Sequence, residues 1–355
     1  MSGGLGPDIE MIFQKILHIA ATAAWLVVGA ACASTPEPSQ RAVLRQLVQG
    51  HVKDGFSGVV LVAANGHIVL SDAFGEMAGR PVSKHDRFWI ASTGKQFVSA
   101  AILKLVDGGR LSLDDPLSKF FPEAPSDKAA TTVRQLLSHT SGFPQSYVAE
   151  DFSTREDATP TMLAEPLQGA PGEKFRYSNL NYQMAAAIVE IASGENYREF
   201  VKRELWAPAR LSSTGFSTPE TAGVVSAIST PLPPRLRRIT WDEQGVYSSA
   251  KDLYRWNRAL SGGKILSTGA RAELYKPTAP ISEGEAALGW FIDRSPSGAT
   301  RIFTRGNEDF GANSLVYFYP DSKTLIIVLT HAGDADEDTS WSRLIHKEID
   351  AALGL

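Results

Sequence analysis

Hydrophobic and polar positions alternate in short runs near both ends of the chain, as is typical of β-strands. Residues 58–63 form a β-branched run, Ala64-Asn65-Gly66 supplies a tight turn, and residues 67–70 return as a second apolar run. This order predicts a β-hairpin. Nearer the C-terminus, the same kind of composition predicts three further strands, at residues 301–304, 314–319 and 324–330.

The periodicity becomes helical between these two regions. Residues 93–106 place their apolar positions on one helical face, and the Gly-Gly pair at 108–109 ends the pattern. Thr132 is a candidate N-cap for a short helix that runs through Leu137. Further helices are predicted at residues 41–50, 181–192, 197–205, 250–260 and 341–353.

Strands at both ends with helices between them predict that the terminal strands meet in one sheet. The predicted class is α+β, with an antiparallel sheet built from about residues 41–91 and 290–355 and flanked by helices. A mainly helical lobe is then inserted at about residues 92–289. In such an arrangement we expect a catalytic site where the sheet and the lobe meet.

Composition and charge exclude several classes of function. The chain is 43% hydrophobic and 21% charged, which is ordinary for a globular protein. Its formal net charge of −4 and its lack of a long basic block give no reason to expect nucleic acid as a partner. None of the seven histidines has zinc-type spacing with the cysteine or with another histidine, so we predict no metal site.

The N-terminal segment has the layout of an export signal. Lys15 precedes an apolar stretch at residues 16–33 that is short for a membrane span and ends in small residues. We expect residues 1–33 to be a signal peptide or lipoprotein signal and residues 34–355 to form the exported domain, periplasmic or secreted. Two alternatives stay open at Cys32: cleavage of the Ala-x-Ala kind around it, or lipidation, which would anchor the protein to a membrane. As the single cysteine, Cys32 also excludes an intramolecular disulfide.

The first predicted helix of the lobe opens with Ser92-Thr93-Gly94-Lys95. Positions i and i+3 share a helix face, so the Ser92 hydroxyl and the Lys95 amine can touch. A serine hydroxyl is a weak nucleophile without such a partner, and the helix N-terminus would favour its alkoxide. The motif is weak alone, because Ser-x-x-Lys recurs at 248–251 and 261–264. Spacing alone favours the alternative that Ser92 is a helix N-cap with a solvated Lys95.

Four motifs stand in a fixed order along the chain: FWIASTGKQF at 88–97, QLLSHTSG at 135–142, PGEKFRYSN at 171–179 and GVYSSAKDL at 245–253. Together they closely resemble the class C β-lactamase, D,D-carboxypeptidase and family VIII esterase group, within the serine β-lactamase and penicillin-binding-protein superfamily. The likeness runs from about residue 42 to the C-terminus. It implies a β-lactamase/transpeptidase-like fold and a serine hydrolase without metal or organic cofactor. Its substrates would be β-lactams, D-Ala-D-Ala peptides or small esters and amides, that is, small-molecule or peptidoglycan-like compounds.

The resemblance also implies roles for individual residues. Ser92 would be the nucleophile, Lys95 its proton acceptor or electrostatic partner, and Tyr177 the general base and acid. Asn179 would hold the substrate amide. Without the resemblance, Tyr177 reads as a loop tyrosine covering an apolar edge and Asn179 as a helix N-cap. His139 invites a Ser–His pair, but the chain has no Gly-x-Ser-x-Gly elbow, and the resemblance places His139 in a structural turn.

The strand expected to line the cleft departs from the family's pattern, which is Lys or His, then Thr, Ser or Gly, then Gly. Counting back from Gly311 puts Arg305 at the first of these positions. An arginine there can bind a substrate carboxylate bidentately or form a cross-strand ion pair with a surface acid. The resemblance implies an oxyanion hole made by the backbone N–H groups of Ser92 and of Asn307 or Glu308. The departure also leaves open a binding protein that acylates and stalls, or a non-catalytic scaffold.

Overall fold

The computed structural model of the chain describes residues 39–217, 241, 245–308, 311–331, 333 and 340–355. The chain separates into two compact units, Met1–Ser39 and Gln40–Leu355, and the architecture below is that of the second unit. The export signal that we expect at residues 1–33 lies outside the described residues. Within the described part of the chain, no helix is long and apolar enough to cross a membrane.

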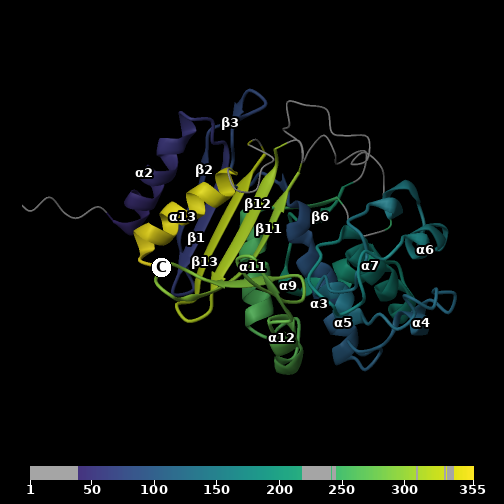
Figure 1. The fold of residues 1–355 in the computed structure, drawn as a ribbon. Helices are drawn as coiled ribbons and strands as arrows, with labels where there is room; N and C mark the ends of the chain where they lie inside the picture. Colours follow the sequence, from purple (N-terminus) through teal and green to yellow (C-terminus); the bar gives the residue numbers. More distant parts are fainter. Residues whose placement is uncertain (1–38, 218–240, 242–244, 309–310, 332, 334–339) are drawn as a thin grey trace, which may run out of the picture. The chain divides into compact units, whose positions relative to one another are not determined.

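An eight-stranded antiparallel sheet forms the centre of the second unit, in the order β2-β1-β13-β12-β11-β10-β9-β8 (Figure 1). Its strands are β1 (Gly58–Ala64), β2 (His67–Phe74), β8 (Ala279–Ile281), β9 (Gly284–Ala286), β10 (Phe291–Arg294), β11 (Thr300–Asn307), β12 (Asn313–Tyr319) and β13 (Thr324–Thr330). The predicted hairpin is β1–β2, and β1 also pairs with β13 from Gly58↔Thr330 to Ala63↔Leu325. The predicted meeting of the two chain ends in one sheet is therefore confirmed.

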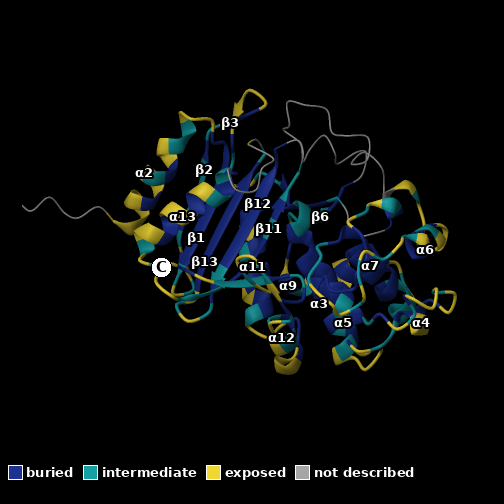
Figure 2. Ribbon diagram, viewed as in Figure 1, coloured by how far each residue is buried: buried dark blue, intermediate teal, exposed yellow. Residues whose placement is uncertain are grey.

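Helices cover both faces of this sheet. The helices α2 (Gln40–Val52) and α13 (Trp341–Leu353) lie on one face, where Val60 and Val62 of β1 share a hydrophobic cluster with them. Val59 and Leu61 point the opposite way, because side chains alternate along a strand, and they join the cluster of the helical lobe. Figure 2 shows the result: the strands are buried, and exposed residues gather on the outer sides of the helices.

The helical lobe packs around α3 (Lys95–Asp107), of which most residues are buried. Its other helices are α4 (Leu117–Phe120), α5 (Val133–Leu137), α6 (Arg155–Ala164), α7 (Asn179–Ser193), α8 (Tyr197–Val201), α9 (Ala207–Ala209), α11 (Ala250–Ser261) and α12 (Thr268–Leu274). Two small sheets complete the unit: β3 (Glu76–Met77) with β4 (Arg80–Pro81), and β5 (Phe88–Trp89), β7 (Val246–Ser248) and β6 (Gly215–Phe216). Thr132 caps α5 in a full capping box with Gln135, as predicted.

Three details differ from the sequence prediction. β8 and β9 extend the sheet into residues that we assigned to the helical lobe; each is three residues long, too short to show a periodicity, and Pro280 is tolerated because β8 is an edge strand. The helix predicted from residue 93 begins as a 3₁₀ turn, η2 (Ala91–Gly94), before α3. The helix predicted at 197–205 continues from α8 as a π-helical segment, η4 (Lys202–Trp206).

Candidate active site

The η2 turn presents Ser92 at the boundary between the sheet and the lobe. Ala91, directly before the serine, has φ = 46°, in the left-handed region that non-glycine residues rarely adopt. Two bonds from β12 fix the turn: Ser314 Oγ lies 2.6 Å from Ile90 O and 2.8 Å from Thr93 Oγ1. The serine therefore sits on a tight turn whose backbone is tied to the sheet.

Two polar groups meet at the Ser92 hydroxyl. Lys95 Nζ donates to Ser92 Oγ at 3.1 Å, and Tyr177 Oη donates to the same oxygen at 2.7 Å. Lys95 Nζ also donates to Asn179 Oδ1 at 2.7 Å. The structure thus brings together four of the residues that the sequence singled out, although they come from η2, α3, α7 and the segment before α7.

Lys95 is held in a polar and aromatic enclosure. Only 6% of the residue is exposed, and Nζ lies 5.3 Å from the ring centre of Tyr177 and 5.5 Å from that of Tyr182. Ring faces and the Asn179 amide oxygen both stabilise positive charge. Such an ammonium, placed between Ser92 and Tyr177, stabilises an alkoxide or a phenolate on either neighbour.

Tyr177 is positioned by the start of α7. The N-cap of that helix is Ser178, not Asn179, so the N-cap interpretation of Asn179 is wrong. Ser178 Oγ donates to Pro144 O at 2.7 Å, and the Ser178 N–H donates to Nδ1 of His139 at 3.1 Å. The His139 ring stacks on Tyr177 with 4.4 Å between ring centres.

His139 is a support for Tyr177 rather than a base for Ser92. Burial, helped by the nearby charge of Lys95, lowers the pKa of His139 to about 3. Its ring is therefore neutral at neutral pH and accepts the Ser178 N–H bond through Nδ1. This arrangement agrees with the structural-turn role that the resemblance implies for His139.

The two other Ser-x-x-Lys motifs lack this geometry. Ser248 is fully buried in β7 and contacts Thr214 Oγ1 at 2.8 Å, while Lys251 is exposed on α11. Ser261 ends α11 before a Gly-Gly pair. Among the hydrogen bonds that the structure describes, the serine–lysine contact of such a motif is made at Ser92.

Strand β11 passes directly behind the nucleophile turn. A Cβ added to Gly306 would lie 2.4 Å from Ile90 O and 2.7 Å from the backbone nitrogen of Ser92, so a side chain there has no room. Because side chains alternate, Thr304 leaves the strand on the same side as Gly306. Arg305 leaves it on the opposite side but still contributes to the lining of the cavity at Ser92. The residue of this strand that faces the Ser92 turn is therefore the buried Thr304. The sequence prediction, which counted back from Gly311, placed Arg305 at that position.

The ladder between β11 and β12 decides which strand N–H can face an oxyanion. The Glu308 N–H donates to Ala312 O at 2.9 Å, so the prediction of Glu308 as an oxyanion donor is wrong. Pairs in an antiparallel ladder alternate between hydrogen-bonded and non-hydrogen-bonded. Glu308 and Ala312 form a hydrogen-bonded pair, so the neighbouring pair, Asn307 and Asn313, is not hydrogen-bonded. The Asn307 N–H therefore points away from β12. An oxyanion hole formed by the N–H groups of Asn307 and Ser92 therefore stays a prediction.

Arg305 lies at the edge of the site with an acidic neighbour. Its guanidinium is 3.7 Å from a carboxylate oxygen of Glu283 and 5.7 Å from the ring centre of Phe303. The ion-pair alternative for Arg305 is thus present in the structure. A role for Arg305 in binding substrate stays a prediction.

A narrow cavity of about 20 Å³ opens onto Ser92. It is lined by Ser92, Lys95, His139, Tyr177, Ala287, Gly289, Trp290, Phe291, Thr304 and Arg305. A larger cavity of about 700 Å³ lies elsewhere, between α11, α12 and the far ends of β11 to β13, and holds none of the predicted site residues. Within the described residues, no group of three or more His, Cys, Asp or Glu side chains is placed to hold a metal ion.

Two positioning residues were missed by the sequence analysis. Gly306 carried a usable signal, because a glycine inside a strand often marks close approach of another backbone. Ser314 carried a weaker one, as a buried hydroxyl at the start of an apolar strand. Its partners, Ile90 and Thr93, are more than 200 positions away in sequence, so no local pattern could reveal them.

Comparison with known proteins adds a family match and shared folds. The family model described as Beta-lactamase matches residues 44–348. A penicillin-binding protein of Bacillus subtilis (strain 168) is 27% identical over 336 residues, covering 85% of this chain and 73% of that protein. The octameric penicillin-binding protein homologue from Pyrococcus abyssi superposes with a TM-score of 0.74 at 22% identity, over 88% of this chain and 77% of its own. The D-amino acid amidase from Ochrobactrum anthropi SV3, complexed with D-phenylalanine, does so with a TM-score of 0.71 at 21% identity, over 88% and 99%.

Proposed function

The chain belongs to the beta-lactamase family, and on that premise we propose that it is a serine hydrolase that forms an acyl-enzyme on Ser92. The observation that carries the proposal is the meeting of Lys95 Nζ and Tyr177 Oη at Ser92 Oγ, at 3.1 and 2.7 Å. A nucleophile within hydrogen-bond reach of a proton acceptor, which is itself oriented by further contacts, is the arrangement that acyl transfer requires. Here Asn179 orients Lys95, and His139 orients Tyr177.

In the proposed reaction, Tyr177 acts as the phenolate that the Lys95 ammonium of this pair stabilises, and it takes the proton of Ser92 Oγ as that oxygen attacks a substrate carbonyl carbon. The tetrahedral oxyanion accepts bonds from the N–H groups of Ser92 and Asn307. The same pair returns the proton to the leaving group as the carbonyl–heteroatom bond breaks. A water molecule then attacks the acyl-enzyme with the pair again as base, which releases the acid and restores Ser92.

We propose β-lactams, D-Ala-D-Ala peptides and small esters or amides as the substrate class. The family match and the likeness to a penicillin-binding protein support the first two. A narrow cavity at Ser92 suits a small acyl group. The assay is a side-by-side comparison of a chromogenic cephalosporin, a p-nitrophenyl ester and a D-Ala-D-Ala peptide, with Ser92→Ala as the background. Ser92-dependent turnover of any of them supports the proposal, and turnover that survives Ser92→Ala contradicts it.

A second candidate is a binding protein of the same fold that acylates and stalls. The observation that favours it is Thr304: the residue of β11 that faces Ser92 is neutral, whereas the family pattern has Lys or His on this strand. Intact-mass measurement over time separates the two functions. An adduct that forms and clears indicates a hydrolase, and one that persists with a β-lactam and with a simple ester indicates a binding protein.

A further inference from the structure

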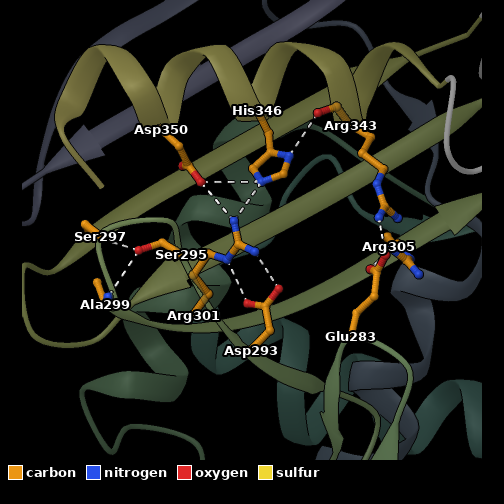
Figure 3. Close-up of polar contacts among 10 residues, drawn as sticks. All are labelled: Glu283, Asp293, Ser295, Ser297, Ala299, Arg301, Arg305, Arg343, His346 and Asp350. Atoms are coloured by element: carbon orange, nitrogen blue, oxygen red, sulfur yellow. Dashed lines mark hydrogen bonds and ion pairs between the residues drawn. The ribbon is translucent and has the colours of Figure 1, made fainter.

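Glu283 lies between two arginines, one of which, Arg305, lines the cavity at Ser92. It occupies the turn of the β8–β9 hairpin; its carboxylate is 2.6 Å from a guanidinium nitrogen of Arg343 on α13 and 3.7 Å from one of Arg305 on β11. Figure 3 shows the side chain of Glu283 rising from the hairpin toward both guanidinium groups. Two cations from different elements thus converge on one carboxylate of the chain itself.

The hairpin that carries Glu283 lies directly against β10, and the pKa of Glu283 is lowered by its two arginines. A Cβ added to Gly284 would lie 2.1 Å from Ile292 O, so the turn is packed directly against β10. Burial opposes ionisation of Glu283, but the hydrogen bond and charge of Arg343 and the charge of Arg305 outweigh it and lower the pKa of this carboxyl. Glu283 is therefore an ionised partner for Arg305 at neutral pH.

Arg305 connects this ion pair to the nucleophile. It lines the cavity that opens onto Ser92 and Tyr177. A guanidinium at such a place is the natural partner for a carboxylate on a bound substrate. In this chain, however, the Glu283 carboxylate already lies next to Arg305. A substrate carboxylate bound to Arg305 would be repelled by the negative charge of Glu283.

We propose that Glu283 is a specificity-determining residue, whose carboxylate takes the place against Arg305 that a substrate carboxylate would occupy. The site then favours acyl substrates that are neutral at this end, such as esters and carboxamides, over their free carboxylates. This inference rests on the proposed function, because it assumes that acyl substrates are bound at Ser92. It narrows the substrate class from all family substrates to those without an anionic group facing Arg305.

The test uses arylboronic acids, which form a tetrahedral adduct with a nucleophilic serine and need no turnover. Two probes are compared by calorimetry, 3-carboxyphenylboronic acid and 3-carbamoylphenylboronic acid, which differ in charge at one position; the para isomers form a second pair. The proteins are the wild type, Glu283→Gln, Glu283→Gln with Arg305→Gln, Glu285→Gln, and Ser92→Ala as the background for serine-dependent binding. Glu285 is the matched control, since it is exposed on the same hairpin and no ion pair of Glu285 appears among the described contacts.

We expect the wild type to bind the carbamoyl probe more tightly than the carboxy probe. Glu283→Gln should raise affinity for the carboxy probe by about 10-fold or more relative to the carbamoyl probe, the scale of one charged hydrogen bond. Adding Arg305→Gln should remove that gain, and Glu285→Gln should leave the ratio within about 2-fold of wild type. Unchanged affinity for the carbamoyl probe shows that Glu283→Gln has not distorted the site.

The outcomes also separate this inference from the proposed function. If both probes bind in a Ser92-dependent way but Glu283→Gln leaves their ratio unchanged, the role of Glu283 is wrong and the serine hydrolase stands. The same conclusion follows if the gain survives Arg305→Gln. If neither probe binds in a way that Ser92→Ala abolishes, both the proposed function and the inference fail.

Discussion

Tyr177 Oη donates a 2.7 Å hydrogen bond to Ser92 Oγ, although the two residues are 85 positions apart in sequence. The contact exists because two separate elements end at the same place: the η2 turn, tied to the sheet through Ser314, and the start of α7, capped by Ser178. Lys95 reaches the same oxygen from one helical turn away. In the proposed reaction, proton transfer at Ser92 is therefore shared by Lys95 and Tyr177, whose positions both depend on these elements.

We predict non-additive effects of substitution at Lys95 and Tyr177. Lys95→Ala and Tyr177→Phe should each lower kcat/KM by roughly 1,000-fold. Since the two residues act as a unit, kcat/KM of the double variant should be close to that of the more impaired single variant. Tyr254→Phe is the control: its hydroxyl donates to Gly66 O, remote from Ser92, and kcat/KM should stay near wild type. Fully multiplicative losses in the double variant would count against a shared proton path.

Gly306→Ala should damage catalysis more than its size suggests. The added methyl group would lie within 3 Å of Ile90 O and the Ser92 nitrogen, so the nucleophile turn or β11 must shift. A displacement on the order of 1 Å can cost about 100-fold in kcat, and overpacking should lower the unfolding free energy by about 1–3 kcal/mol. Gly50→Ala, with nothing within 4 Å of the added carbon, should be neutral or stabilising in both measurements. A normal kcat for Gly306→Ala would show that β11 does not constrain Ser92.

Stability should fall between pH 6.5 and pH 3 because two histidines are buried in the neutral form. Burial, aided by Lys95 at His139 and by Arg301 at His346, lowers the pKa of each to about 3. Below the ordinary pKa of about 6.5, the unfolded chain binds protons that the native chain does not, so the unfolding free energy is highest above pH 6.5 and decreases as pH falls. Each histidine contributes up to about 2 kcal/mol of this loss at pH 5.

Urea denaturation at pH 7.5 and pH 5.0 measures that loss. His346→Gln should reduce the difference between the two pH values by up to about 2 kcal/mol. Replacing the exposed His67 by glutamine should leave the difference unchanged. The same pH difference in wild type and His346→Gln would mean that His346 is not neutral in the native state.

The N-terminal segment is predicted to be removed on export, at about residues 31–33. Protein purified from the producing cells should begin there when its N-terminus is sequenced. A blocked, lipid-bearing Cys32 would select the lipoprotein alternative. Recovery of a chain that still carries residues before Ala31 would contradict cleavage.

The parts of the fold that sequence predicted are those with long, regular patterns. The β1–β2 hairpin and β13 are β-branched runs with a recognisable turn, so their existence and their meeting at the two chain ends followed from periodicity. β8 and β9 have three residues each and hold their place through pairing with β10, which only the folded chain reveals.

In the candidate site, too, local patterns predicted some contacts, and contacts between distant segments could not be predicted from them. The approach of Lys95 to Ser92 follows from helical spacing, whereas Tyr177 and Asn179 needed the family resemblance. The sequence analysis placed the wrong residue of β11 beside Ser92. It counted back from Gly311, and the sequence does not show how many residues the turn between β11 and β12 contains. Glu283 was missed because nothing local to its hairpin indicates that β11 and α13 bring arginines to it.

The most direct test of the account is to identify the residue that a serine-directed reagent labels. A fluorophosphonate, followed by proteolysis and peptide mass spectrometry, should place one adduct on Ser92, and Ser92→Ala should lose the adduct while keeping the wild-type circular dichroism spectrum. With a p-nitrophenyl ester, the acyl adduct on Ser92 should appear and then clear. Labelling of Ser248 or Ser261 instead, or wild-type labelling of the Ser92→Ala protein, would contradict the assignment of Ser92 as the nucleophile.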